Sequence, residues 1–109
     1  IRAITGWQYT VAEALLTGER VATMGRIFNI REGITSAADT LPKRMFKPTS
    51  AGALVDGGVD PDKMQHAISM FYSMMGWDAE TGVPTPEKIA QLGLSWIEEE
   101  APFREAAAV

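Results

Sequence analysis

The chain has 109 residues, of which 46% are hydrophobic and 22% are charged, a composition typical of a globular domain. Its 14 acidic and 10 basic residues give a net charge of -4, which argues against nucleic acid or an anionic membrane surface as its partner. No apolar run approaches the roughly 20 residues that span a bilayer, and no segment resembles a signal peptide. Because cysteine is absent, residues 1–109 can form no disulfide, thiolate cluster or cysteine nucleophile.

The one histidine, His66, further restricts the chemistry that this chain can carry. A structural zinc site usually needs four Cys or His ligands, and a catalytic zinc about three protein ligands. Any Ser-His-Asp triad would have to use His66, which falls within a predicted helix and far from any Gly-x-Ser-x-Gly sequence. We therefore interpret His66 as an exposed helix residue and assign no catalytic, cofactor-binding or metal-binding residue.

The first strong secondary-structure signal begins at Thr10. The sequence from Thr10 to Glu13 has the capping-box pattern, in which the hydroxyl accepts a backbone N–H and the glutamate reaches back to the first residue. We predict a helix from Val11 to about Glu32, ended by Gly33 in the left-handed conformation.

Small residues form a stripe along one side of this predicted helix. At about 100° per residue, Leu15, Gly18, Ala22, Gly25 and Asn29 share a narrow face. Two glycines inside a helix each cost ~0.5–1 kcal/mol relative to alanine, so we expect a packing reason for them. Further apolar residues on the other sides are typical of a helix buried in a larger body. We expect the stripe to contact a helix or chain outside this segment; packing within the segment is the alternative.

The same helix carries three arginines that are candidates for contacts with other domains. The alternative is that they are surface charges, worth at most ~1 kcal/mol each in ion pairs. Together with the stripe they make up the candidate interdomain contacts: Gly18, Arg20, Ala22, Gly25, Arg26, Asn29 and Arg31.

An irregular connection follows over residues 34–59, because Pro and Gly interrupt every apolar period there. A connection of this length is unusual in a compact domain unless it wraps another surface. Asp60 followed by Pro61 predicts the start of a second helix, which carries an amphipathic pattern to Met75 and ends at Gly76.

Two shorter helices are predicted near the end of the chain. Thr85 with Pro86 repeats the cap-and-proline signal and opens a helix to Leu92, closed by Gly93. The sequence Ser95-Trp96-Ile97-Glu98 is a second capping-box pattern. No segment alternates as a strand does. The predicted fold class is all-α, an irregular helical domain with long loops, over the single segment 1–109.

Several short phrases occur in a fixed order along the chain. They are Ile4-Thr5-Gly6-Trp7, Gly18-Glu19-Arg20, Arg26-Ile27-Phe28-Asn29-Ile30-Arg31-Glu32-Gly33, Asp39-Thr40-Leu41-Pro42, Gly76-Trp77-Asp78, Pro84-Thr85 and Leu92-Gly93-Leu94. In this order and at these intervals, the chain from Ile1 to about Leu94 resembles the C-terminal part of aldehyde ferredoxin oxidoreductases.

The resemblance implies a large enzyme that oxidises aldehydes to carboxylic acids and passes two electrons through an iron–sulfur cluster to ferredoxin. Its cofactors would be tungsten, or molybdenum, held by two pterin dithiolenes, and a 4Fe–4S cluster bound by cysteines. The family's cluster cysteines and its Asp-x-x-Gly-Leu-Cys pterin motif precede the matched part, so no functional residue carries over to this chain. The segment is therefore expected to hold no cofactor and to be inactive alone, with the remaining domains of the same enzyme and ferredoxin as partners and the cytoplasm as its location.

Two other functions are left open by the sequence. One is a tungsten-dependent aryl-CoA reductase of the same family, and the other is a stand-alone helical interaction module. The abrupt start at Ile1 and the long helix that is apolar nearly all round favour an enzyme fragment over the module. Formation of a homo-oligomer is also left open.

Overall fold

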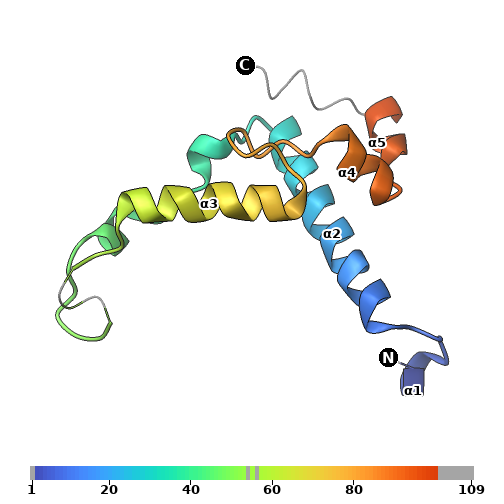
Figure 1. Ribbon diagram of the computed structural model, residues 1–109, viewed down its shortest axis with the longest axis horizontal. Coiled ribbons are helices and arrows are strands. Elements are labelled where there is room, and N and C mark those ends of the chain that lie inside the picture. The colour runs from blue at the N-terminus through green and yellow to red at the C-terminus, as the bar shows by residue number, and fades with distance from the viewer. Residues whose placement is uncertain (1, 54, 56, 101–109) are drawn as a thin grey trace.

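The computed structural model describes residues 2–53, 55 and 57–100, whose regular secondary structure is helical (Figure 1). In chain order the elements are α1 (Arg2–Thr5), α2 (Val11–Arg31), η1 (Ser36–Ala38), η2 (Lys43–Phe46), α3 (Pro61–Met75), α4 (Pro86–Gln91) and α5 (Ser95–Glu100). Within this described part, the β-type pairing is one isolated antiparallel bridge between Trp77 and Pro84. The predicted all-α class is confirmed.

The capping box at the start of α2 forms as the sequence predicts. The Thr10 hydroxyl accepts the backbone N–H of Glu13 at 3.2 Å, and the Glu13 carboxylate accepts the backbone N–H of Thr10 at 2.7 Å. At the other end, Gly33 has a φ of 81°, and the N–H groups of Gly33 and Ile34 bond to carbonyls of the last turn. The helix therefore begins and ends where local hydrogen bonding satisfies its terminal backbone groups.

The predicted bounds of α3 are also confirmed. The Asp60 carboxylate accepts the backbone N–H of Asp62 at 2.9 Å, and Gly76 ends the helix with a φ of 71°. Helix α4 ends one residue before Leu92, which is its C-cap. Helix α5 begins at Ser95 itself, whereas the capping-box pattern would place Ser95 just before the first helical residue.

The connection between α2 and α3 is irregular, as predicted, apart from its two short 3-10 helices. It is closed by a hydrogen bond from the Val59 N–H to the Met45 carbonyl, at 2.8 Å. Gly58 allows this closure because a Cβ atom there would overlap the backbone of Phe46. In Figure 1 the green part of the connection extends away from the place where α2 and α3 meet.

The apolar core lies between the C-terminal half of α2 and the two last helices. Ile89 and Leu92 are 0% exposed, and they pack with Ile27, Ile30, Leu94 and Ile97. Two polar contacts reinforce this packing. Arg20 Nε donates to the Leu92 carbonyl at 2.8 Å, and Lys88 Nζ lies 2.5 Å from Glu19 Oε2. The core thus fastens the middle of α2 to α4.

The N-terminal half of α2 projects beyond this core, with α1 at its far end (Figure 1). Val11 is 78% exposed and Leu15 is 66% exposed. The described helices include none long and apolar enough to cross a lipid bilayer. A projecting helix with exposed apolar residues is instead typical of a surface that another protein segment covers.

Candidate functional site

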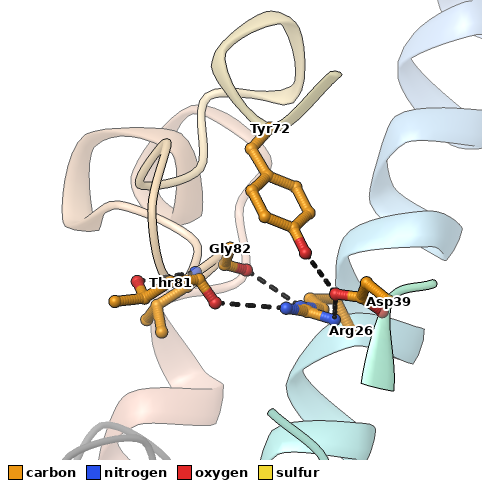
Figure 2. A network of polar contacts seen from close by, with 6 residues as sticks. Arg26, Asp39, Tyr72, Thr81 and Gly82 are labelled. Atoms are coloured by element: carbon orange, nitrogen blue, oxygen red, sulfur yellow. Dashed lines mark hydrogen bonds and ion pairs between the residues drawn. The ribbon is translucent and has the colours of Figure 1, made fainter. Parts of the chain in front are cut away.

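A buried arginine, Arg26, lies at the centre of a network of hydrogen bonds beside α3 (Figure 2). Arg26, which is 6% exposed, pairs through Nη1 with Asp39 Oδ2 at 2.7 Å. Its Nε donates to the Gly82 carbonyl at 2.9 Å and its Nη2 to the Thr81 carbonyl at 3.2 Å. Arg26 therefore ties α2 to the segment after η1 and to the loop that precedes α4.

Tyr72 joins the same network from α3. Its hydroxyl donates to Asp39 Oδ2, the oxygen that also accepts from Arg26 (Figure 2). The Arg26 guanidinium carbon lies 5.3 Å from the centroid of the Tyr72 ring and 5.8 Å from that of Trp77, within the range of cation–π attraction. Burial, as the largest cause, and the hydrogen bond to Asp39 together raise the pKa of Tyr72 to about 12, although the charge of Arg26 opposes the rise. Tyr72 is thus a neutral hydrogen-bond donor at physiological pH.

The raised pKa of Tyr72 predicts a loss of stability in strong base. The pKa of Tyr72 in the folded state lies above the ordinary value of 10.0. The contribution of neutral Tyr72 to the free energy of unfolding is therefore fully present below pH 10 and is lost as the pH rises towards about 12. We expect the free energy of unfolding of the wild type to fall more steeply across this window than that of Tyr72→Phe. Urea unfolding of both proteins at a series of pH values is the measurement. Parallel declines would show that Tyr72 does not carry the effect.

A groove of about 730 Å³ lies between α2 and α3, over this network. One wall comes from α2, and the opposite wall comes from α3. Buried side chains that line it include Arg26, Tyr72 and Trp77. The walls are mainly small or apolar: Ala22, Gly25 and Asn29 from α2, and Met64, Ala67, Ile68 and Phe71 from α3. The arrangement can bind an apolar surface above a floor whose charges are already paired.

Four of the predicted interdomain residues line the groove, namely Ala22, Gly25, Arg26 and Asn29. The other three lie outside it: Gly18 and Arg31 are exposed, and Arg20 is bonded to α4. A Cβ atom at Gly18 or Gly25 would meet no neighbouring atom within 4 Å. Packing within the described residues therefore does not explain these two glycines.

Arg26 has an internal role that the sequence analysis did not anticipate. It is not a surface charge, and all three of its bonded nitrogens contact groups of this chain. The sequence analysis also missed its partners Asp39, Tyr72, Thr81 and Gly82. One signal was available for Tyr72, because a tyrosine on an apolar helix face usually finds a partner for its hydroxyl when buried.

Among the residues that the structure describes, the buried side-chain atoms without a hydrogen-bond partner are Thr23 Oγ1 and Trp77 Nε1. Among residues 2–53, 55 and 57–100, no three or more His, Cys, Asp or Glu side chains are placed to hold a metal ion. His66 is exposed on α3, as predicted.

Comparison with known proteins identifies relatives of this chain. Residues 1–94 match the family model described as aldehyde ferredoxin oxidoreductase, domains 2 and 3. The chain is similar to the tungsten-containing aldehyde ferredoxin oxidoreductase of Pyrococcus furiosus, with 31% identity over 97 residues, covering 87% of this chain and 15% of the relative. The protein of the same name from Pyrococcus abyssi is 30% identical over 86% of this chain, and that from Thermococcus kodakarensis is 29% identical over 87% of this chain. Each alignment covers 15% of the relative.

The chain thus spans about 15% of the length of the curated relatives that it matches. No solved structure matches it.

Proposed function

The chain belongs to the aldehyde ferredoxin oxidoreductase family, and on that premise we propose that it is a C-terminal segment of an enzyme that oxidises aldehydes to carboxylic acids. The electrons would pass to ferredoxin, and the enzyme would act in the cytoplasm. The observation that carries the proposal is the match of residues 1–94 to the family model. The relatives are named as tungsten-containing enzymes, which supports tungsten as the metal of the whole protein.

The residues of this segment do not fit the family's cofactors. A 4Fe–4S cluster needs cysteine thiolates, and the chain has no cysteine. The described residues also offer no cluster of three carboxylate or imidazole ligands for a metal. We therefore assign the tungsten pterin and the iron–sulfur cluster to other parts of the enzyme, and we derive no chemical step from residues 1–109.

The role of this segment is to present a folded helical surface to the remaining domains. The Arg26 network holds α2, α3 and the loop before α4 in one arrangement. That arrangement supports both walls of the groove, which carries four of the seven residues expected to contact other domains. The segment thus contributes a surface for contacts between domains, and the rest of the enzyme contributes the cofactors and the catalytic residues.

Metal content tests the proposed function directly. The purified 109-residue chain should contain no stoichiometric tungsten, molybdenum or iron, because it lacks the thiolates that would hold a cluster. The complete polypeptide that contains this segment should contain tungsten and iron, and should reduce ferredoxin when an aldehyde is added. Elemental analysis by mass spectrometry and a ferredoxin reduction assay make the two measurements. Stoichiometric metal in the 109-residue chain, or reduction of aryl-CoA in place of aldehyde oxidation, would contradict the proposal.

A further inference from the structure

Exposed apolar side chains lie on both helices that form the groove. On α3, Met70, Phe71 and Met74 are at least half exposed. On α2, Leu15 and Val21 are more than half exposed. Soluble proteins rarely leave large contiguous apolar patches in water, and such patches mark interaction sites. The two helices thus carry exposed apolar side chains beyond those that line the groove, which favours a protein segment over a small molecule as its occupant.

The α2 wall allows an unusually close approach. Gly18, Ala22 and Gly25 follow one another along a single face of α2, and the last two line the groove. A Cβ atom at either glycine would meet no neighbouring atom within 4 Å. Packed helices lie about 8–10 Å apart depending on the side chains between them, and small residues permit the shorter distances. The α2 wall thus fits the backbone of a second helix.

The floor of the groove requires no charged ligand. Arg26 is paired with Asp39, and the same carboxylate accepts the hydroxyl proton of Tyr72. A pocket for a small polar ligand usually presents a few unpaired polar groups that fix the ligand's orientation. The titratable groups of this floor are instead bonded to one another, and Trp77 Nε1, which has no partner among the described residues, is a neutral donor, so the complementary surface carries no charge.

Most of the length of the related enzymes lies outside the region that aligns with this chain, which spans about 15% of them. We propose that the groove between α2 and α3 receives an apolar helix from the part of the same polypeptide that lies outside residues 1–109. The occupant carries small or medium apolar side chains along α2 and larger ones against Ala67 and Ile68 of α3. The inference rests on family membership and not on the proposed aldehyde chemistry.

Because this chain has no cysteine, a single cysteine introduced in the groove can be labelled specifically by a thiol reagent. Ala67 and its neighbour His66 are both exposed on α3, but only Ala67 lines the groove. We compare Ala67→Cys with the matched control His66→Cys, each in the 109-residue chain under dilute conditions and in the complete polypeptide that contains it. A maleimide is the probe, and peptide mass spectrometry separates these thiols from any others. In the complete polypeptide, labelling of Ala67→Cys should slow by at least tenfold, while labelling of His66→Cys changes little.

Three results of the labelling experiment would overturn the inference. The first is equal labelling of Ala67→Cys in the two proteins. The second is equal protection of both variants, which would not be specific to the groove. The third is protection of Ala67→Cys that disappears when the complete polypeptide dissociates into monomers on dilution, because a second copy would then be the occupant. The labelling results do not depend on metal content. A complete polypeptide that holds no tungsten but protects the groove would therefore refute the proposed function and leave the inference about the groove standing.

Gly25→Leu provides a second measurement on the opposite wall. In the 109-residue chain the added side chain meets open space, so the urea midpoint should stay the same or rise because leucine is the better helix former. In the complete polypeptide the same change should lower the midpoint, because it overfills the contact with the docked helix. An unchanged or raised midpoint in both proteins would overturn the inference.

Discussion

Replacing Arg26 with methionine should lower the free energy of unfolding by about 3 kcal/mol, because it removes one partner of a buried ion pair. The Asp39 carboxylate would lose its nearest positive charge, and the carbonyls of Thr81 and Gly82 would lose their donors. The Asp39 side chain is 30% exposed, so water offsets part of the loss and the value falls at the low end of that seen for buried pairs. Urea unfolding of Arg26→Met and the wild type gives the difference.

Arg31→Met is the matched control, because Arg31 is an exposed arginine near the end of the same helix. Its effect should stay within about 0.5 kcal/mol, as is usual for surface substitutions. Adding Asp39→Asn to Arg26→Met should recover part of the lost stability, since the uncompensated carboxylate is then removed. If Arg26→Met and Arg31→Met had the same urea midpoint, the network would not stabilise the fold.

Gly82→Ala should destabilise the chain by about 2–5 kcal/mol, from two separate causes. Gly82 has a φ of 67°, in the left-handed region that costs other residues energy. A Cβ atom at Gly82 would also lie 2.7 Å from Cζ of Tyr72 and would overlap the Arg26 guanidinium. The loop must therefore move away from the network, and the bond from Arg26 Nε to the Gly82 carbonyl weakens.

Gly93→Ala separates these two causes. Gly93 has the same φ of 67°, but a Cβ atom there would meet no neighbouring atom within 4 Å. Gly93→Ala should lower the free energy of unfolding only by the cost of placing alanine in the left-handed backbone conformation, about 1–2 kcal/mol. Gly82→Ala should exceed it by about 1–3 kcal/mol, the usual cost of overpacking. Thermal or urea unfolding of both variants is the measurement, and equal losses would contradict close packing of Gly82 on Tyr72 and Arg26.

The sequence by itself determined where the main helices begin and end. Thr10 and Asp60 cap α2 and α3, and Gly33 and Gly76 end them, as predicted. These boundaries follow from hydrogen bonds and backbone angles within a few residues, so they can be read without knowledge of the fold. Residue types alone also determined that no thiolate site exists in this chain.

The tertiary structure alone decided which polar residues meet. Arg26 bonds to Asp39 and to the carbonyl of Gly82, which is 56 positions away in the chain. The helical period places Arg26 and Arg31 on different sides of α2, but it does not tell which side the rest of the chain covers; the structure buries Arg26 and exposes Arg31. The difference arises because α3 and the loop before α4 pack over only one side of α2 and exclude water there, so a guanidinium on that side must find partners within the chain. The groove has the same origin, since its walls belong to helices that approach each other only in the folded chain.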